Sequence, residues 1–163
     1  MNKVTIRKVQ LEDLERIAKI ESVCFPVAEA APRESFKERI NAFPDYFLVA
    51  ETAESIIGFI NGCVTNSPVI YDELFHNTQH HIPDGKNLTV FGLDVLPEYR
   101  RQGIAAQLMQ HFIQTAKNTD RKNVILTCKE RLIHYYESFG YVNNGISAST
   151  HGDAQWFDMT LVL

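Results

Sequence analysis

The amino-acid sequence predicts an α/β fold with about seven strands and about four helices. Segments in which apolar and polar residues alternate, as in half-buried strands, are interspersed with segments in which apolar residues recur at helical spacing. The chain has 163 residues, of which 45% are hydrophobic and 22% charged, so it can bury one sizeable core. We therefore expect a single domain over residues 1–163.

The first half of the chain is expected to contain three strands, two helices and a loop bounded by prolines. Val4 and Ile6 alternate with polar neighbours, whereas apolar residues after Leu11 follow helical spacing. Pro26 and Pro32 interrupt that spacing. The predicted elements are a strand at 4–7, a helix at 11–23, a loop at 24–32, a helix at 33–41, and a hairpin of strands at 47–50 and 56–64.

The second half is expected to contain four strands and two helices after a long irregular loop. About 20 residues after Asn66 lack periodicity, and a loop of that length is usually functional or mobile. Gly92 lies inside an apolar strand, where glycine often marks a bulge or the close approach of a ligand. The predicted elements are strands at 88–95, 124–127, 141–147 and 155–163, and helices at 103–118 and 129–139.

Charge is distributed unevenly along the chain, which has a net charge of −4. Residues 100–131 carry seven basic and two acidic side chains, whereas the remainder carries nine basic and 18 acidic ones. A basic stretch on an acidic protein suits a compact polyanion, because a long nucleic acid would also meet the repelling surface. The alternative is a solvated helix face. We expect neither nucleic acid nor a membrane among the partners.

The cysteines and the amino-terminal segment predict a reducing environment. Cys24, Cys63 and Cys128 are odd in number and lack the spacing of a metal site, so we interpret them as small buried residues. The amino terminus lacks the apolar core of a secretion signal, and we expect a cytoplasmic location. No metal is expected, because the histidines of the irregular loop lack a neighbouring cysteine. These histidines are His76, His80 and His81.

The transition from the strand at 88–95 to the helix at 103–118 has the features of an anion-binding site. The first amides of a helix have no partners within the helix, and the helix dipole places positive charge there. Gly103 and Ala105 are small enough to admit a phosphate, and Arg100 and Arg101 add positive charge. The pattern lacks the glycine spacing of a P-loop or a Rossmann turn.

This order of elements, with the segments FGLDVLPEYRRQGIA and CKERLIHYYESFGY, resembles the Gcn5-related N-acetyltransferase (GNAT) superfamily over essentially the whole chain. Within it, the two segments are most similar to arylalkylamine N-acetyltransferases. The resemblance implies a mixed, mostly antiparallel central sheet flanked by helices, and acetyl-CoA as the acetyl donor. It implies that the strand binds the pantetheine arm and the turn binds the pyrophosphate. The residues assigned to acetyl-CoA are Leu93, Asp94, Val95, Arg100, Arg101, Gln102, Gly103, Ile104, Ala105 and Ala106.

The same resemblance assigns catalysis to Tyr136, which matches a tyrosine that protonates the departing CoA thiolate. The alternative role for Tyr136 is that of a core aromatic residue. The arylalkylamine enzymes also carry two histidines that help to remove the amine proton, but the matching positions here are Thr89 and Phe91. The proton must therefore take another route. The sequence does not rank the candidate proton acceptors, which are Glu21, Glu29, Glu34, Asp94 and His80.

These assignments imply direct acetyl transfer to a primary amine, such as an arylalkylamine or a polyamine-like molecule, in a ternary complex. Phe25, Pro26 and Glu29 are expected to line the acceptor site, and loop packing is the alternative role for them. Two other functions are open at this stage: acetylation of a protein N-terminus or lysine, and a CoA-binding regulatory module without catalysis. The formation of a homodimer is open as well.

Overall fold

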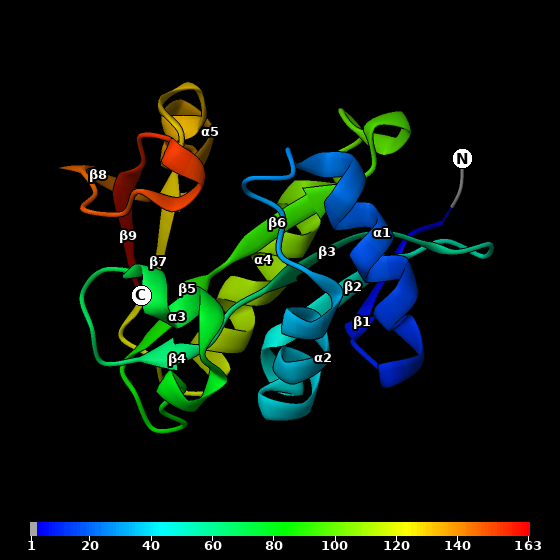
Figure 1. Cartoon of the computed structure of the whole chain (residues 1–163), viewed down its shortest axis with the longest axis horizontal. Helices are drawn as coiled ribbons and strands as arrows, with labels where there is room; N and C mark the ends of the chain where they lie inside the picture. Colours follow the sequence, from blue (N-terminus) through cyan, green and yellow to red (C-terminus); the bar gives the residue numbers. More distant parts are fainter. Residues whose placement is uncertain (1–2) are drawn as a thin grey trace. The chain divides into compact units, whose positions relative to one another are not determined.

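The computed structural model describes residues 3–163 and groups them into two compact units (Figure 1). The first unit consists of the described chain up to Gly62 together with residues 92–115, and the second consists of residues 63–91 and 116–163. Each unit has its own sheet. The expected single domain over residues 1–163 includes Met1 and Asn2, which lie outside the described residues, and it stays a prediction.

The first unit is built on four antiparallel strands in the order β1–β2–β3–β6. Helices α1 and α2 cover the front of this sheet in the view of Figure 1, and α4 runs behind it. The elements are β1 (Thr5–Lys8), α1 (Leu14–Cys24), α2 (Arg33–Ala42), β2 (Phe47–Glu51), β3 (Ile56–Asn61), β6 (Gly92–Val95) and α4 (Ile104–Asn118), which belongs to this unit up to Thr115.

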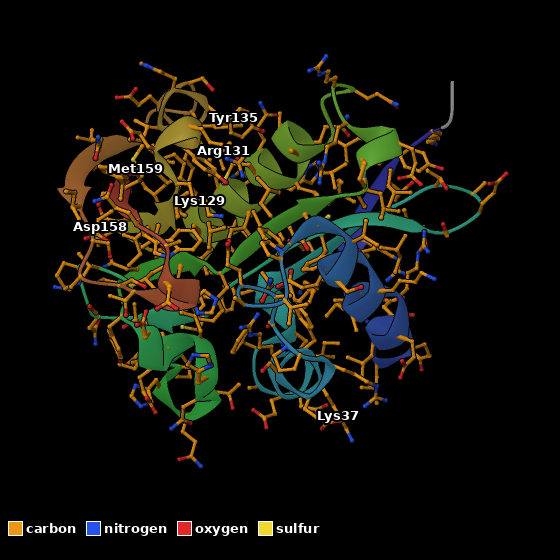
Figure 2. All side chains as sticks on the ribbon, turned by 45° about the horizontal axis from the view of Figure 1, so that its top comes forward. Lys37, Lys129, Arg131, Tyr135, Asp158 and Met159 are labelled. Atoms are coloured by element: carbon orange, nitrogen blue, oxygen red, sulfur yellow. The ribbon has the colours of Figure 1, made fainter. Side chains whose placement is uncertain are left out.

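The hydrophobic core of this unit contains three phenylalanines together with aliphatic residues of the sheet and of helices α1 and α2. The Phe36 ring of α2 packs edge-on against Phe47 and Phe59, with centroid distances of 6.2 and 5.5 Å. Ile40 lies one helical turn after Phe36 and is also buried. Lys37, the residue after Phe36, points away from the ribbon (Figure 2). Phe36 and Ile40 therefore lie on the buried face of α2.

The second unit is built on five strands in the order β4–β5–β7–β9–β8. The pair β5 and β7 is parallel, and the other pairs are antiparallel. The predicted α/β class with mixed, mostly antiparallel strands is therefore confirmed. The elements are β4 (Val64–Thr65), α3 (Asp72–His76), β5 (Asn87–Val90), β7 (Asn123–Cys128), α5 (Ile133–Glu137), β8 (Val142–Ile146) and β9 (Phe157–Val162).

The described chain has nine strands in two sheets, whereas the sequence predicts seven strands in one central sheet. Two predicted strands are each divided. The run at 56–64 becomes β3 and β4, and the run at 88–95 becomes β5 and β6, with Phe91 between them. The divided segments have different partners, because β5 pairs with β4 and β7 while β6 pairs with β3. A continuous apolar run in the sequence does not show where a strand changes its pairing partner.

Helices differ from the sequence prediction in two places. The irregular loop contains α3, whose first turn carries Asp72 and Glu73, acidic residues that favour a helix N-terminus. The helix predicted at 129–139 begins as a 3-10 turn at Glu130–Leu132 and continues as the short α5. Among the described residues, no helix is long and apolar enough to cross a membrane.

Candidate functional site

Strand β6 is the edge strand of the first unit's sheet. The N–H of Leu96, just after β6, donates to the carbonyl oxygen of Ile57 at 2.9 Å. Hydrogen-bonded and non-hydrogen-bonded pairs alternate in an antiparallel ladder, so the backbone groups of Leu93 and Val95 point away from β3. The outer edge of β6 can therefore pair through its backbone with an extended ligand.

Two side chains hold the end of β6 through the carbonyl oxygen of Val95. The Nε of Arg100 donates to this oxygen at 3.0 Å, and the Sγ of Cys24 donates to it at 3.5 Å. Burial raises the pKa of Cys24 and outweighs the opposing effect of Arg100, so the thiol keeps the proton that it donates. Arg100 therefore connects the strand to the turn that follows it.

The turn between β6 and α4 has two left-handed residues, Arg101 with a φ of 62° and Gly103 with a φ of 79°. A non-glycine residue rarely adopts this conformation, and such residues concentrate at ligand sites. The first backbone bond of α4 runs from the N–H of Gln107 to the carbonyl of Gly103, so the amides before Gln107 have no partner within the helix. A Cβ at Gly103 would meet no atom within 4 Å. The residues 100–106 therefore fit a phosphate group.

A buried polar cluster lies on the α1 and α2 side of the same sheet. It consists of Glu21 from α1, Arg39 from α2, Asn61 from β3 and Asp94 from β6, with exposed fractions of 7, 4, 1 and 1%. The Nη1 of Arg39 donates to Oδ1 of Asn61 at 3.0 Å. The backbone N–H of Ala31 donates to Oε2 of Glu21 at 2.8 Å. Four elements and the loop after α1 thus meet in one polar environment.

The carboxyl groups of Glu21 and Asp94 lie close enough to interact electrostatically. Burial raises the pKa of Asp94 well above its ordinary value, the charge and hydrogen bond of Glu21 raise it further, and Arg39 lowers it. In the described part of the chain, no N–H or O–H group donates to either Asp94 carboxylate oxygen. Burial and the charge of Glu21 therefore both favour the protonated form of the Asp94 carboxyl.

Among the five candidate proton acceptors, Glu21 and Asp94 interact with each other. Glu34 is exposed and forms an ion pair with Arg33 at 2.9 Å. His80 lies in the second unit, where its Nδ1 is 2.9 Å from the hydroxyl of Tyr71. The remaining candidate, Glu29, is half-buried in the loop after α1.

Backbone hydrogen bonds within the loop after α1, and one to the side chain of Glu21, hold this loop in place. The N–H groups of Glu29 and Ala30 both donate to the carbonyl oxygen of Pro26 at 2.9 Å, and Ala31 is bonded to Glu21. Phe25 and Glu29 are half-buried, and Pro26 is exposed. The role of Phe25, Pro26 and Glu29 in acceptor binding stays a prediction.

Tyr136 lies on α5 in the second unit and is 9% exposed. Its ring packs edge-on against Tyr135 and Tyr141, with centroid distances of 5.3 and 5.9 Å. Burial raises the pKa of Tyr141 well above its ordinary value, and the neighbouring Tyr136 adds to this effect. The assignment of Tyr136 as the acid that protonates the thiolate stays a prediction.

The two positions that match the histidines of the arylalkylamine enzymes carry no acid–base group. The Oγ1 of Thr89 accepts a hydrogen bond from the N–H of Cys63 at 2.9 Å and donates to its carbonyl at 3.0 Å. The Phe91 ring packs against Phe75 with a centroid distance of 5.0 Å. Both side chains therefore serve the packing of the second unit.

His81 and the cysteines Cys63 and Cys128 lie in packed parts of the second unit. The Nδ1 of His81 accepts a hydrogen bond from the N–H of Val64 at 3.0 Å, and burial lowers the pKa of His81. Cys63 and Cys128 are buried, as the sequence predicts, whereas Cys24 is partly exposed. Within residues 3–163, no group of His, Cys, Asp and Glu side chains is arranged to hold a metal ion.

Sequence reasoning missed Arg39 and Asn61. Arg39 lies one residue before the buried Ile40, and Asn61 ends a strand whose other residues are apolar or glycine. A polar residue at the end of an apolar run is a usable signal for a buried polar contact. The partner of each residue comes from another element, so the sequence alone does not identify it.

Comparisons with known proteins agree with this architecture. The sequence model described as "Acetyltransferase (GNAT) family" matches residues 14–141. The "Probable hydrolase YhcX" of Bacillus subtilis (strain 168) is 28% identical over 145 residues, which cover 82% of this chain and 28% of that protein. The "N-alpha-acetyltransferase" of Saccharolobus solfataricus (strain ATCC 35092 / DSM 1617 / JCM 11322 / P2) is 28% identical over 114 residues, which cover 70% of this chain and 63% of that protein.

The fold also has solved counterparts. The structure "GphF GNAT-like decarboxylase in complex with isobutyryl-CoA" has a TM-score of 0.84 and 18% identity, and the match covers 97% of this chain and 98% of that one. Likeness at this identity shows the fold alone. The chain spans 28 and 63% of the length of the two curated relatives. The family match nevertheless covers most of the chain, including β6, the turn and all of α4. The chain therefore belongs to the acetyltransferase (GNAT) family.

Proposed function

We propose that the protein transfers an acetyl group from acetyl-CoA to a primary amine by direct attack. The main support for this proposal is that three features follow one another along the chain of the first unit. They are the edge strand β6, the turn with left-handed residues and the N-terminus of α4. An open edge strand suits an amide-bearing arm, and a turn with unpaired amides suits a pyrophosphate.

Acetyl-CoA supplies the acetyl thioester, and the chain's residues supply the positioning. We assign the pantetheine arm to the backbone of Leu93 and Val95, and the pyrophosphate to the amides and basic side chains of residues 100–106. A backbone N–H at Leu93 would polarise the thioester carbonyl as negative charge develops on its oxygen. Asp94 belongs to this strand, but its side chain is buried toward Glu21. We therefore assign it no direct contact with the donor.

The acceptor is a neutral amine that attacks the thioester carbon. Tyr136 would donate a proton to the departing thiolate, a step for which a phenol is chemically suited. No covalent intermediate on the protein is required. Most of the rate enhancement would come from holding the amine against the thioester.

The proposed acceptor class is a small primary amine, either an arylalkylamine or a polyamine-like molecule. Two features support this class. The chain outside residues 100–131 carries twice as many acidic as basic side chains, which attracts a cationic acceptor. The segments that resemble arylalkylamine N-acetyltransferases include both the turn and Tyr136.

A second candidate acceptor is the amino terminus or a lysine of a protein. The similarity to an N-alpha-acetyltransferase favours this candidate, since that match covers 70% of the chain. Both candidate acceptors present a primary amine, so the same donor site would serve either one.

The testing experiment measures thiol release from acetyl-CoA with a panel of aryl, alkyl and polyamine acceptors and short peptides. Donor binding is measured separately by calorimetry. We expect turnover with one class of small amine, and turnover with peptides alone would select the protein acceptor. Tight donor binding without turnover on any acceptor would favour a regulatory CoA-binding module. Absence of donor binding would overturn the proposed function.

A further inference from the structure

The Glu21 and Asp94 carboxyl groups belong to separate elements but form one acid–base unit. Glu21 lies in the last turn of α1, and Asp94 lies in β6 between the two residues whose backbone faces the open edge. Both side chains are more than nine-tenths buried. The unit is therefore placed directly beside the strand that we assign to the acetyl donor.

Gly92 lies beside this unit and carries no side chain toward it. Gly92 and Asp94 are two residues apart in β6, so they face the same side of the sheet. A Cβ at Gly92 would lie 3.3 Å from Oδ1 of Asp94 and 3.7 Å from Nδ2 of Asn61. Gly92 is itself only half-buried. The missing side chain thus leaves Oδ1 of Asp94, which is itself buried, without a Cβ beside it at this position.

The polar atoms of Asn61 and Asp94 beside Gly92 can accept a further hydrogen-bond partner. Within residues 3–163, neither Nδ2 of Asn61 nor the Asp94 oxygens have a hydrogen-bond donor or acceptor apart from the Glu21 carboxyl. Buried polar atoms are normally satisfied by protein or by ordered water. A water or a substrate N–H beside Gly92 would satisfy both residues.

We propose that Glu21 and Asp94 act as one proton acceptor for the amine substrate, reached from the side of Gly92. This inference rests on the proposed function, and it names the proton route that the threonine and phenylalanine at positions 89 and 91 do not provide. Asp94 is the group nearest Gly92, and in this proposal Glu21 shares its proton. Arg39 lies close enough to stabilise the doubly deprotonated state of the pair.

The proposed step balances in atoms and charge. The substrate ammonium gives one proton to the fully deprotonated pair, directly or through one water. The neutral nitrogen then attacks the thioester carbon, so that a C–N bond forms, the C–S bond breaks and the electron pair goes to sulfur. A second proton leaves the nitrogen and ends on sulfur as the CoA thiol. The pair finally returns its proton to water.

The pH dependence follows from the groups that face Asp94, which are Glu21 and Cys24 from α1 and Arg39 from α2. Burial, followed by Glu21, raises the pKa of Asp94 well above its ordinary value. The pair accepts a proton only after its shared proton has left. We therefore expect kcat/KM to rise with pH as that proton dissociates.

The experiment compares the pH profiles of the wild type, Asp94→Asn, Glu21→Gln and Gly92→Ala. Each profile is measured with two acceptors, an alkylamine that is protonated at neutral pH and a low-pKa amine that is already neutral. With the alkylamine, we expect kcat to fall about a hundredfold in Asp94→Asn and the rise with pH to disappear. With the neutral amine, we expect a much smaller loss. Donor affinity should stay unchanged.

Gly92→Ala keeps both carboxyl groups but places a methyl group against Oδ1 of Asp94. This variant therefore tests whether the substrate proton reaches Asp94 from the side of Gly92. We expect slower alkylamine turnover with donor affinity retained. Glu38→Gln, an exposed carboxylate on α2, is the matched control and should follow the wild-type profile. Thermal unfolding of each variant checks that the fold is intact.

The outcomes separate the two proposals. Equal losses with both amines in Asp94→Asn, or an unchanged profile in both Asp94→Asn and Glu21→Gln, would overturn the proton-acceptor role and leave the acetyltransferase intact. An unchanged rate in Gly92→Ala would overturn access from that side. Absence of transfer by the wild type to any amine would overturn the proposed function itself, and with it the acceptor role.

Discussion

The Nε of Arg100 donates a hydrogen bond to the carbonyl oxygen of Val95 at 3.0 Å, which fixes the turn before α4 to the end of β6. Arg100 as a whole is an exposed residue. The side chain that carries charge toward the turn therefore also sets the position of the turn relative to the strand.

Replacing Arg100 by alanine should weaken acetyl-CoA binding about fivefold, because one hydrogen bond of about 1 kcal/mol is lost at a partly exposed position. Calorimetry measures the affinity. Arg16→Ala is the matched control, since the Nε of Arg16 donates at 2.9 Å to a strand carbonyl, that of Ile56, away from the turn. Equal loss of affinity in both variants would contradict the role of Arg100 in the turn.

Gly103→Ala should reduce both stability and donor affinity. An L-residue at a φ of 79° costs about 1–2 kcal/mol, and the added methyl group enters the open space above the turn. Gly145→Ala controls for the strain, because Gly145 has a φ of 99° and likewise has no atom within 4 Å of a built Cβ. Chemical denaturation and calorimetry should show similar destabilisation in both variants but weaker acetyl-CoA binding in Gly103→Ala alone.

Tyr136→Phe should lower kcat about a hundredfold with donor affinity retained, because it removes only the proton proposed for the thiolate. Tyr141→Phe removes a hydroxyl from the ring that packs against Tyr136 at 5.9 Å and should leave kcat nearly unchanged. Stopped-flow thiol detection measures both rates. Wild-type turnover in Tyr136→Phe would reduce Tyr136 to a core residue.

The stability of the first unit should fall in acid through Asp13. Burial alone would raise the pKa of Asp13, but hydrogen bonds from Arg7 and from the N–H of Gln10 outweigh burial and lower it. The folded state therefore binds fewer protons than the unfolded state. The stabilisation is present above the ordinary Asp pKa of 3.8 and is lost as the pH falls through the lower folded value.

Thermal unfolding measured from neutral pH into acid tests this expectation. Asp13→Asn should be less stable than the wild type at neutral pH, and the difference should shrink as the pH falls. Lys8→Ala removes an exposed ion pair with Asp45 and should change little at any pH. A difference between wild type and Asp13→Asn that is independent of pH would contradict the assignment.

Alternation along β6 predicts the face of the sheet on which Asp94 lies. The sequence places Asp94 on the face opposite to Leu93 and Val95, and the buried contact of Asp94 with Glu21 agrees with that placement. The spacing of α4 and its start after Gly103 were also predictable, because a glycine turn followed by helical spacing is a local signal.

Features that depend on distant partners were not predictable. The apolar run at 88–95 gives no sign that pairing changes at Phe91, since strand partners are set by segments far away in the chain. The raised pKa of Asp94 depends in part on Glu21. These two residues lie far apart in the sequence, and helical or strand periodicity describes only neighbouring residues. Residue type and spacing identified both carboxyl groups as candidates, but only the packing of α1 against β6 paired them.

Because β6 is the edge strand of its sheet, a bound substrate would add to the hydrogen-bonded sheet of the first unit. Exposed strand edges are liable to pair with other chains, and natural proteins keep them short, as this edge of four residues is. An acetyl donor that bonds to Leu93 and Val95 would occupy the place of a missing neighbouring strand. Bound donor should then slow the hydrogen exchange of these two amides, as a neighbouring strand would.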